Sequence, residues 1–589
     1  MSGIVGFINN QKNKKEITQK MIEKIIYRGT KHQSFYDDNQ VGLGQCLLKN
    51  KENVTYQDNL AIVLDGNIFN KEELIKKLKL KKVTDAELIL ASYKKWGSEA
   101  PKYLKGDFAF VIWDKEKEIL YGARDYFGIK PLFYSKKNDF IFASEIKAIL
   151  AYPNLKKELN KDAIAPYLVF NFNPLEETFF KDVFTLKPGH YFIYQNGEFE
   201  TKKYFEIQYE EVNYEKEKFV KLLADATAKS VQTSLKGEKK VGSFLSSGVD
   251  SSYLVCLAKP KKTFTVGYAE QRYSEITNAK ELSEQLGIEN KSRIINKDEF
   301  LEIVPKVMYH LEEPMADPGA VAFYFGTEAA SQYCDVVTCG EGADEFFAGY
   351  GVYQDSFKFP AYAKIPFFMR RAVSKLVSKL PEFKGSEFLI RRGQKLEEWY
   401  TGLNWIFREK ELKRYLNNQK IAPISLITKD AFDEFKGQND LNKMLGFDVK
   451  FHLSKNFMVN VDRLSAAFSL DTRVPIANID IFDIARKIPF EGKVSKTESK
   501  IYWRAAAQTI IPNESFKKKK LGFPVPLREW IKEENYYNHI KEMFSSDIAK
   551  EIFNYEALMK MLNDKNADYK KVWSLYSFLV WYHEFFKQN

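Results

Sequence analysis

A short loop of small and hydroxylated residues is the part of the chain best suited to binding a nucleotide. It reads LSSGVDSS over residues 245–252, follows the apolar run VGSF and opens a helical pattern. Small residues let the backbone approach an anion, and the free N–H groups at a helix N-terminus favour phosphate there. Asp250 adds a carboxylate of the kind that magnesium prefers. Because the GxxxxGK[ST] pattern is absent, the sequence predicts a phosphate-binding loop other than a Walker A site.

A second, acidic segment completes this predicted site. It reads CGEGADE over residues 339–345 and follows the apolar run DVVT. Acidic groups beside a phosphate loop are explained by a divalent cation between them, so Asp250 and Asp344 are predicted metal ligands. The alternatives are a serine-rich helix cap and a solvated acidic turn. The pairing of the two segments disfavours both.

The elements that would bring these loops together are strands alternating with helices. Helical patterns cover residues 214–235 and 274–287, and the apolar runs KKVGSFL, KTFTVGY and DVVTCG read as strands. This alternation predicts a parallel, doubly wound α/β sheet, whose ligands bind at the carboxyl ends of the strands. Beyond Glu345 the chain is predicted to be mostly helical.

The first part of the chain has a different pattern. Residues 1–205 hold many short apolar runs separated by turn residues, and two helical segments near Glu16–Ile26 and Ala86–Trp96 interrupt them. This pattern predicts an α+β sandwich with helices packed on sheets. The polar stretch 206–215 reads as a linker. We therefore predict two domains, residues 1–205 and 206–589.

Composition limits the function classes. The 589 residues are 44% hydrophobic and 29% charged, and the net charge of +11 is spread along the chain, with Lys517–Lys520 as its tightest run. This spread argues against nucleic-acid binding. No apolar run approaches the ~18 residues of a membrane span, and no basic region precedes the N-terminal apolar stretch. The four cysteines lack metal-ligand spacing. The expectation is a soluble cytoplasmic protein that binds no membrane.

At these motifs a family resemblance emerges. The segments SSGVDSS, TFTVGY and GEGADE, in this order, resemble the ATP-pyrophosphatase domain of glutamine-hydrolysing asparagine synthetases. The similarity extends over nearly the whole chain and is carried by further segments, namely RGT, DGNIFN, GDFAFVIWD, GARDYFGIKPLFY, ASEIKAI, LEETFFKDVFTLKPGHY, DRLSAAFSLDTRVP and KKKLGFPVP.

The resemblance implies a fold and an activity. The first domain would be an αββα sandwich of the N-terminal-nucleophile type that hydrolyses glutamine. The second would be an ATP-pyrophosphatase domain with a helical C-terminal part, which activates the aspartate side-chain carboxylate as an acyl-adenylate and releases pyrophosphate. Ammonia would pass between the sites through an internal tunnel. ATP and Mg²⁺ would be needed, the other substrates would be small molecules, and a homodimer would be expected.

The resemblance also implies roles for single residues. Leu245 and Val266 would contact adenine, Asp250 and Asp344 would hold magnesium, and Glu341 would support amidation. Lys500 would stabilise the negative charge that develops on the leaving pyrophosphate. The full set implied to bind ATP is Leu245, Ser246, Ser247, Gly248, Asp250, Ser251, Val266, Cys339 and Gly340.

The first domain departs from the family at its predicted nucleophile. The family has a cysteine after the initiator methionine, whereas this chain has Ser2. A hydroxyl is a weaker nucleophile than a thiol at neutral pH. Leu47 stands where the family has an arginine that binds the carboxylate of glutamine. Leaving a buried ligand charge unpaired costs on the order of 2–5 kcal/mol.

Two further changes fall in the same pocket. Asp65 replaces an asparagine that donates to the oxyanion, and losing one such donor lowers a rate by about 100- to 1,000-fold. Asn67 replaces a glutamate that reads the α-ammonium of glutamine, whereas Gly66 and Asp85 are kept. The sequence therefore predicts impaired glutamine hydrolysis and a synthetase that depends on ammonia.

The second domain departs less. Its changes leave open which carboxylate is activated and accepts the nitrogen. Ser247 replaces a glycine, Cys339 replaces a serine, and residues 476–478 read IAN where the family has FLD. Aspartate is the default carboxylate. The alternatives are a sugar acid, a peptide or another small carboxylate, as in β-lactam-forming and lasso-peptide-forming relatives, although Glu341 stands where the β-lactam enzymes have a tyrosine. A non-catalytic nucleotide-binding paralogue is disfavoured by the retained site residues.

Overall fold

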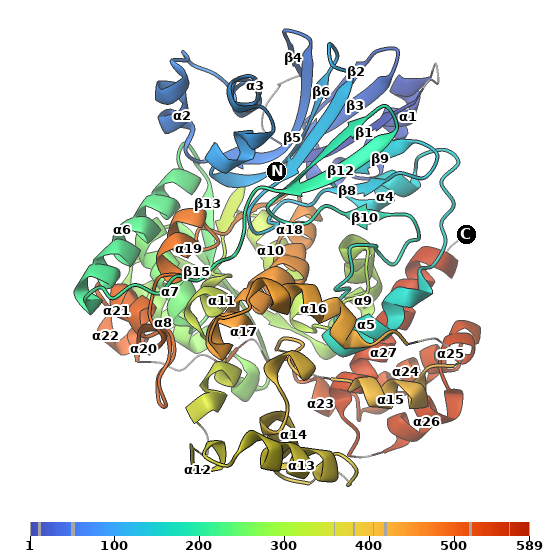
Figure 1. The fold of residues 1–589 in the computed structure, drawn as a ribbon, viewed down its shortest axis with the longest axis vertical. Coiled ribbons are helices and arrows are strands. Elements are labelled where there is room, and N and C mark those ends of the chain that lie inside the picture. The colour runs from blue at the N-terminus through green and yellow to red at the C-terminus, as the bar shows by residue number, and fades with distance from the viewer. Residues whose placement is uncertain are drawn as a thin grey trace.

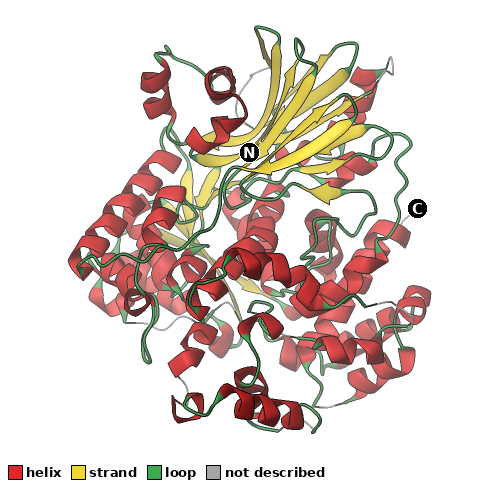
Figure 2. Cartoon of the chain, in the orientation of Figure 1, coloured by secondary structure: helices red, strands yellow, loops and turns green. Residues whose placement is uncertain are grey.

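The computed structural model has a layered β-rich region followed by an α/β region with a large helical part (Figure 1). Figure 2 shows the strands of the first region gathered above a body composed mostly of helices. The structure describes residues 2–9, 13–48, 54–357, 360–380, 383–403, 406–417, 421–517, 521–522, 524–564 and 566–587.

The β-rich region consists of two six-stranded sheets. The order of the first is β10 (Phe184–Thr185), β8 (Phe133–Ser135), β9 (Phe140–Ala143), β1 (Ser2–Ile8), β3 (Val41–Leu47) and β2 (His32–Asp37). The order of the second is β12 (Glu198–Lys203), β11 (His190–Gln195), β7 (Ile119–Arg124), β6 (Gly106–Asp114), β5 (Leu60–Ile68) and β4 (Thr55–Gln57).

The apolar residues of β6 explain the layering. Phe108, Phe110 and Ile112 belong to the core beneath the helices α2 (Lys71–Leu78) and α3 (Asp85–Trp96). Their neighbours Ala109, Val111 and Trp113 belong to the core between the two sheets. Alternate strand residues face opposite sides, so a strand covered on both faces is apolar throughout. With α1 (Lys14–Glu23) and α4 (Ile146–Leu150) packed on the first sheet, the predicted αββα sandwich is confirmed.

The second region contains a five-stranded parallel sheet. Its order is β15 (Glu289–Ile295), β14 (Lys262–Tyr268), β13 (Val241–Phe244), β16 (Val336–Thr338) and β17 (Asp471–Arg473). From β13 the chain first adds strands on one side and then on the other, so β13 and β16 flank the point where the winding reverses. This confirms the predicted doubly wound sheet, and ligands bind at such a point.

Helices cover this sheet and form the rest of the region. α6 (Lys216–Ser234) precedes the first strand, and the helices between the strands include α7 (Val249–Ala258), α8 (Ile276–Gln285), α9 (Lys297–Leu311), α10 (Gly319–Ser331) and α11 (Ala343–Phe347). The later ones include α13 (Phe367–Val377), α14 (Ser386–Arg392), α15 (Glu409–Tyr415), α16 (Ile424–Glu434), α17 (Asp440–Asp448), the π-helix η7 (Val449–Phe457), α18 (Met458–Ala466), α19 (Ile479–Ala485), α21 (Ile501–Gln508), α24 (Glu534–Phe544), α25 (Asp547–Ile552), α26 (Tyr555–Asn563) and α27 (Tyr569–Tyr582). The expectation of a mostly helical C-terminal part is confirmed.

The stretch predicted as a linker is instead packed against the second region. Ile207 and Tyr209 are buried. The N–H groups of Glu210 and Val212 donate to carbonyl oxygens that follow α19, at 3.1 and 3.0 Å. Polar composition alone suggested a free connection, but the alternating apolar residues give this stretch a buried side.

Within the described part of the chain, no helix is long and apolar enough to cross a membrane.

Candidate active site at the edge of the parallel sheet

The loop after β13 is held in shape by its own serines. The Gly248 N–H donates to Ser246 Oγ at 3.1 Å, and the Ser246 N–H donates to Ser251 Oγ at 3.1 Å. Gly340, two residues after β16, lies against the same turn, because a Cβ there would be 3.1 Å from the nitrogen of Ser251. The two loops that the sequence paired therefore meet at one edge of the sheet, with the first turn of α7 between them.

Two buried carboxylates converge on one lysine beside this loop. Lys500 Nζ lies 2.7 Å from Asp250 Oδ2 and 2.7 Å from Asp344 Oδ1. The indole N–H of Trp503 donates to Asp250 Oδ1 at 2.8 Å, which fixes the carboxylate in place. All three charged residues are less than 10% exposed. Gly349 passes so close that a Cβ there would lie 1.8 Å from Asp344 Oδ1.

This arrangement fits a cation bound with a nucleotide. One oxygen of each carboxylate points toward a position between them, and the ammonium group of Lys500 occupies that position in this structure. Magnesium is usually held by one or two carboxylates together with phosphate oxygens, so these two aspartates and the adjoining phosphate-type loop are a suitable donor set. We keep Asp250 and Asp344 as predicted magnesium ligands and the loop as the predicted ATP site.

The remaining predicted ATP residues lie in the walls around the loop. Leu245 packs with residues of α7 and α8, and Val266 is 9% exposed. Ser247 donates to Glu275 Oε1 at 2.6 Å, and the Leu521 N–H donates to the same oxygen at 2.8 Å. Glu275 thus ties the KKKLGFPVP segment to the loop. Within the basic run, Lys518–Lys520 lie outside the described residues.

A second acidic pair lies behind the cation position. The hydroxyl of Tyr350 donates to Glu345 Oε1 at 2.6 Å, while Glu341 lies nearer the surface. Burial, together with the charges of Asp344 and Glu341, raises the pKa of Glu345 to about 8. Glu345 therefore carries a proton at neutral pH, and this lowers the repulsion within the acidic cluster.

The protonated state of Glu345 leads to a pH-dependent prediction. Its pKa is raised in the folded state, so the stability it contributes is complete below about pH 4.5 and is lost as the pH rises through about 8. We expect Glu345→Gln, a neutral analogue, to stabilise the protein relative to wild type by on the order of 5 kcal/mol at pH 9 and by less than half of that at pH 6. Urea unfolding without divalent cations measures this difference. An equal difference at both pH values would contradict it.

The predicted nucleophile pocket has a different character. Ser2 is 4% exposed, and strand pairing places it opposite Leu47. Its hydroxyl lies 3.0 Å from Asp65 Oδ1 and 3.2 Å from the carbonyl oxygen of Leu64, and it accepts the Gly66 N–H at 3.3 Å. The Ser2 hydroxyl therefore donates to acceptors of the protein, and a carboxylate lies where the family has an oxyanion donor.

Asp85, a residue of the predicted glutamine pocket that this sequence keeps, is already paired with a cation. Lys71 Nζ lies 3.0 Å from Asp85 Oδ1, and the Ile68 N–H donates to Asp85 Oδ2 at 3.1 Å. The amide nitrogen of Asn67 is buried without a hydrogen-bond partner among the described residues. Lys71 was not singled out in the sequence, although its position just after DGNIFN was the available signal.

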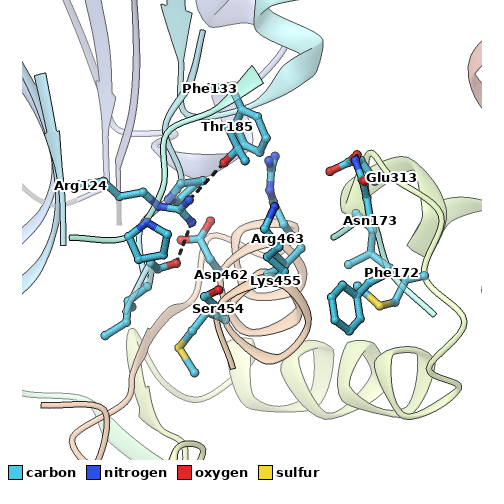
Figure 3. Close-up of a pocket in the computed structure, with 18 of the residues that line it drawn as sticks. Arg124, Phe133, Phe172, Asn173, Thr185, Glu313, Ser454, Lys455, Asp462 and Arg463 are labelled. Atoms are coloured by element: carbon cyan, nitrogen blue, oxygen red, sulfur yellow. Dashed lines mark hydrogen bonds between the residues drawn. The ribbon is translucent and has the colours of Figure 1, made fainter. Parts of the chain in front are cut away.

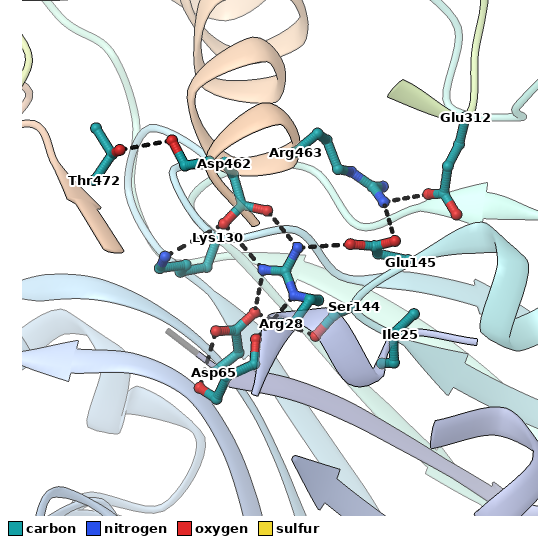
Figure 4. A network of polar contacts seen from close by, with 12 residues as sticks. Ile25, Arg28, Asp65, Lys130, Ser144, Glu145, Glu312, Asp462, Arg463 and Thr472 are labelled. Atoms are coloured by element: carbon teal, nitrogen blue, oxygen red, sulfur yellow. Dashed lines mark hydrogen bonds and ion pairs between the residues drawn. The ribbon is translucent and has the colours of Figure 1, made fainter. Parts of the chain in front are cut away.

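A buried charge network that sequence analysis missed joins the two regions (Figure 4). Arg28 is fully buried and lies 2.9 Å from Asp65, 2.9 Å from Glu145 and 2.8 Å from Asp462 on α18. Its Nε–H also donates to the carbonyl oxygen of Ser2 at 2.8 Å. Burial alone would lower the pKa of Arg28, but the three carboxylates hold it well above its usual value.

The network continues deeper into the second region. Lys130 lies 3.3 Å from Asp462, and Arg463 contacts both Glu312 and Glu145. Figure 4 shows Arg28 between Asp65 and Asp462, with Arg463 reaching from the orange helix α18 toward Glu145. Buried ion pairs therefore connect the degenerate nucleophile pocket to the second region, beside apolar contacts such as that of Leu48 with Ala466.

Comparisons with known proteins agree with this architecture. Residues 222–583 match the family described as asparagine synthase, and residues 1–205 match the family described as glutamine amidotransferase domain. The chain is 34% identical to asparagine synthetase [glutamine-hydrolyzing] 1 of Bacillus subtilis (strain 168), across 99% of this chain and 96% of that protein. It is 25% identical to asparagine synthetase [glutamine-hydrolyzing] 3 of the same organism, across 90% and 89%.

Among solved structures, the glutamine phosphoribosylpyrophosphate amidotransferase from B. subtilis complexed with ADP and GMP matches 49% of this chain and 65% of that one. The identity is 14% and the TM-score 0.26, too low to add to the argument. The two family matches and the similarity to the first of these relatives are sufficient to assign the chain to a family. The chain belongs to the asparagine synthase family, and its two regions carry the amidotransferase and the AMP-forming ligase architecture of that family.

Proposed function

We propose that this protein is an ATP- and magnesium-dependent amide ligase that takes ammonia from solution. It activates a carboxylate, by default the side chain of aspartate, as an acyl-adenylate. Ammonia then attacks the adenylate and gives the amide, with AMP and pyrophosphate as the other products. The observation that carries the proposal is the contrast between the two sites. The ligase site keeps its buried Asp250–Lys500–Asp344 cluster, whereas the amidotransferase pocket is filled by the protein's own polar groups.

The residues of the ligase site have distinct tasks in this proposal. The backbone of the Ser246–Ser251 turn holds phosphate, and Gly340 leaves room for the nucleotide beside α7. Asp250 and Asp344 would hold magnesium, which when bound neutralises phosphate charge. Lys500 moves from the two carboxylates toward the phosphates and stabilises the charge that develops on pyrophosphate. Glu341 lies at the rim, where it orients the acceptor and receives the proton that ammonia loses.

The amidotransferase pocket supports the loss of glutamine hydrolysis. Asp65 would place a negative charge beside a developing oxyanion, and its second oxygen is held by Arg28. Lys71 competes with the α-ammonium of glutamine for Asp85. Leu47 offers no charge to the α-carboxylate. We propose that residues 1–205 act mainly as a structural partner of the ligase region, which begins near residue 206, and that the protein forms a homodimer.

The structure also bears on which carboxylate accepts the nitrogen. Ala477 lies 3.5 Å from a Cβ built on Gly342, so the altered stretch IAN borders the acidic loop directly. The loss of the family's acidic residue there removes one charge from the acceptor side of the site. This observation favours a sugar acid or another small carboxylate as the alternative to aspartate.

The deciding experiment measures pyrophosphate release with ATP, magnesium and aspartate, supplied with either ammonium or glutamine. We expect asparagine, identified by mass, from ammonium, and at least about 100-fold less from glutamine, as follows from losing an oxyanion donor. The initial rates at matched nitrogen concentrations give the ratio.

Other outcomes separate the parts of the proposal. Equal amounts of asparagine and glutamate from glutamine would show that Ser2 hydrolyses glutamine, and the argument from the pocket would be wrong. If neither nitrogen source gives product in a protein that binds Mg²⁺–ATP, aspartate is not the acceptor. A panel of sugar acids and small carboxylates then replaces it.

A further inference from the structure

A cavity lies between the β-rich region and the helix formed by η7 and α18 (Figure 3). Its volume is about 50 Å³, enough for about three to five water molecules. Figure 3 shows Arg124 approaching from the β-rich region, Ser454, Lys455 and Asp462 from the orange helix, and Asn173 and Glu313 from the opposite side. None of these residues belongs to the ATP site or to the Ser2 pocket.

Arg124, at the end of β7, is a buried cation without a carboxylate partner. It is 5% exposed. Its guanidinium donates to the carbonyl oxygens of Lys130 at 2.7 Å, Gly128 at 2.9 Å and Leu186 at 2.7 Å, and to Thr185 Oγ1 at 3.1 Å. No carboxylate of the described residues lies within 4.0 Å of it. Burial lowers the pKa of Arg124 to about 10.

Lys455 presents a second cation to the same cavity. Its ammonium group donates to the carbonyl oxygen of Leu175, and no described carboxylate lies within ion-pair distance. Burial lowers the pKa of Lys455 to about 8, and the nearby charge of Glu313 offsets this only in part. The two cations therefore enter one cavity from the two regions of the chain.

The negative charges that line the cavity have other partners. Asp462 is bound by Arg28 at 2.8 Å and by Lys130 at 3.3 Å. Glu313 Oε1 accepts from Asn173 at 2.7 Å and from the Phe179 N–H at 3.0 Å, and burial raises the pKa of Glu313. The remaining lining cations are already compensated, because Lys187 contacts Glu176 and Arg463 contacts Glu312. The hydrogen-bond partners of Glu313 are neutral, so its charge offsets part of that of Lys455. Because no described carboxylate pairs with Arg124, the net charge that lines the cavity is still positive.

Buried charges in proteins are normally paired, since an unpaired ion loses its hydration without a replacement. We propose that this cavity binds one small oxyanion, of the size of phosphate or acetate, between Arg124 and Lys455. The volume excludes a nucleotide or glutamine. The bound anion joins the two regions, because one cation comes from a strand of the sandwich and the other from the helix that precedes Asp462.

The test measures thermal stability against increasing inorganic phosphate and, separately, acetate, at constant ionic strength and without nucleotide or magnesium. We expect a saturable rise in Tm with at least one of them, as ligand linkage requires. A rise with only phosphate or only acetate identifies the class of anion that binds, and either result supports the proposal, as does a rise with both. Absence of a saturable shift with either overturns it.

Three variants locate the binding. Lys455→Gln is expected to weaken binding by about tenfold or more, the effect of one charge-assisted hydrogen bond, and Lys455→Arg to retain it. Lys187→Gln is the matched control, because that lysine borders the same cavity but is half-exposed and paired with Glu176. Ser246→Ala is expected to leave the shift unchanged. A shift lost in Ser246→Ala and kept in Lys455→Gln would place the anion in the nucleotide loop and overturn the proposal.

If Lys455→Gln does not fold, the anion-dependent Tm shift of Lys455→Arg and a crystal of the protein grown with selenate or arsenate test the site. An anomalous peak between Arg124 and Lys455 supports the site. An empty cavity in a crystal that shows the anion elsewhere overturns it.

Discussion

Replacing Lys500 with methionine is expected to lower kcat/KM for ammonia-dependent pyrophosphate release by about 100- to 1,000-fold, the usual result of removing one group that stabilises developing charge. Lys500 is the only cation that the described residues place between Asp250 and Asp344, at 2.7 Å from each. The measurement is the initial rate of pyrophosphate release over a range of ATP and carboxylate concentrations. A loss confined to KM for ATP would show that Lys500 only binds the nucleotide.

The same variant has an independent effect on stability. Without Lys500, the two buried carboxylates lose the ammonium group that lies 2.7 Å from each of them, and breaking a buried pair in this way costs about 3–5 kcal/mol. Magnesium can replace the missing charge, so it is expected to raise the Tm of Lys500→Met more than that of wild type, while EDTA lowers it more. A magnesium response equal to that of wild type would argue against Asp250 and Asp344 as the magnesium ligands.

Lys493→Met is the matched control for both measurements. Lys493 is also buried, but its ammonium donates to Asn442 Oδ1 at 3.1 Å rather than to a carboxylate. Burial lowers the pKa of Lys493 to about 8, and no carboxylate of the described residues lies within ion-pair distance of it, so its replacement leaves none of them without its cation. We expect its rate of pyrophosphate release and its magnesium response to equal those of wild type.

The parts of the fold that could be predicted are those with strong local patterns. The run FAFVIW of β6 is apolar because both faces of the strand are covered, and the loops after β13 and β16 carry residues that suit phosphate and magnesium. β15 was missed because it is the edge strand of its sheet, and its sequence ENKSRII is largely polar. β17 has only three residues, too few for a period to appear.

The charged network shows why the rest could not be predicted. Arg28 and Asp462 are 434 positions apart, and no local pattern indicates that they touch. Asp65 was singled out as a lost donor, but its partner Arg28 could be identified only once both sheets were folded. Likewise Asp85 could be identified as a retained residue of the glutamine pocket, but its partner Lys71 became evident only from the fold. Sequence can name the chemistry of a residue, while the partner that neutralises it depends on the tertiary fold.

Arg28→Met is expected to be the most destabilising single substitution outside the ligase site. It would leave the carboxylates of Asp65, Glu145 and Asp462 together in the interior, at a cost of about 3–5 kcal/mol. All of them are less than 5% exposed, so water cannot replace the guanidinium. Urea unfolding followed by intrinsic fluorescence measures the change. Unfolding that matches wild type would mean that the three carboxylates share protons in place of Arg28.

Two further substitutions test whether the stability lost in Arg28→Met comes from unpaired buried charge or from the loss of any contact between the two regions. Asp65→Asn is expected to be mild, about 1 kcal/mol, because Arg28 keeps its contacts with Glu145 and Asp462 and the new amide still reaches the Ser2 hydroxyl. Lys161→Met removes another ion pair between the regions, Lys161–Glu551, whose side chains are 55% and 58% exposed. Exposed pairs contribute about 0–1 kcal/mol, so its unfolding midpoint should barely move. A loss for Lys161→Met as large as that for Arg28→Met would show that contact between the regions, rather than buried charge, sets the stability.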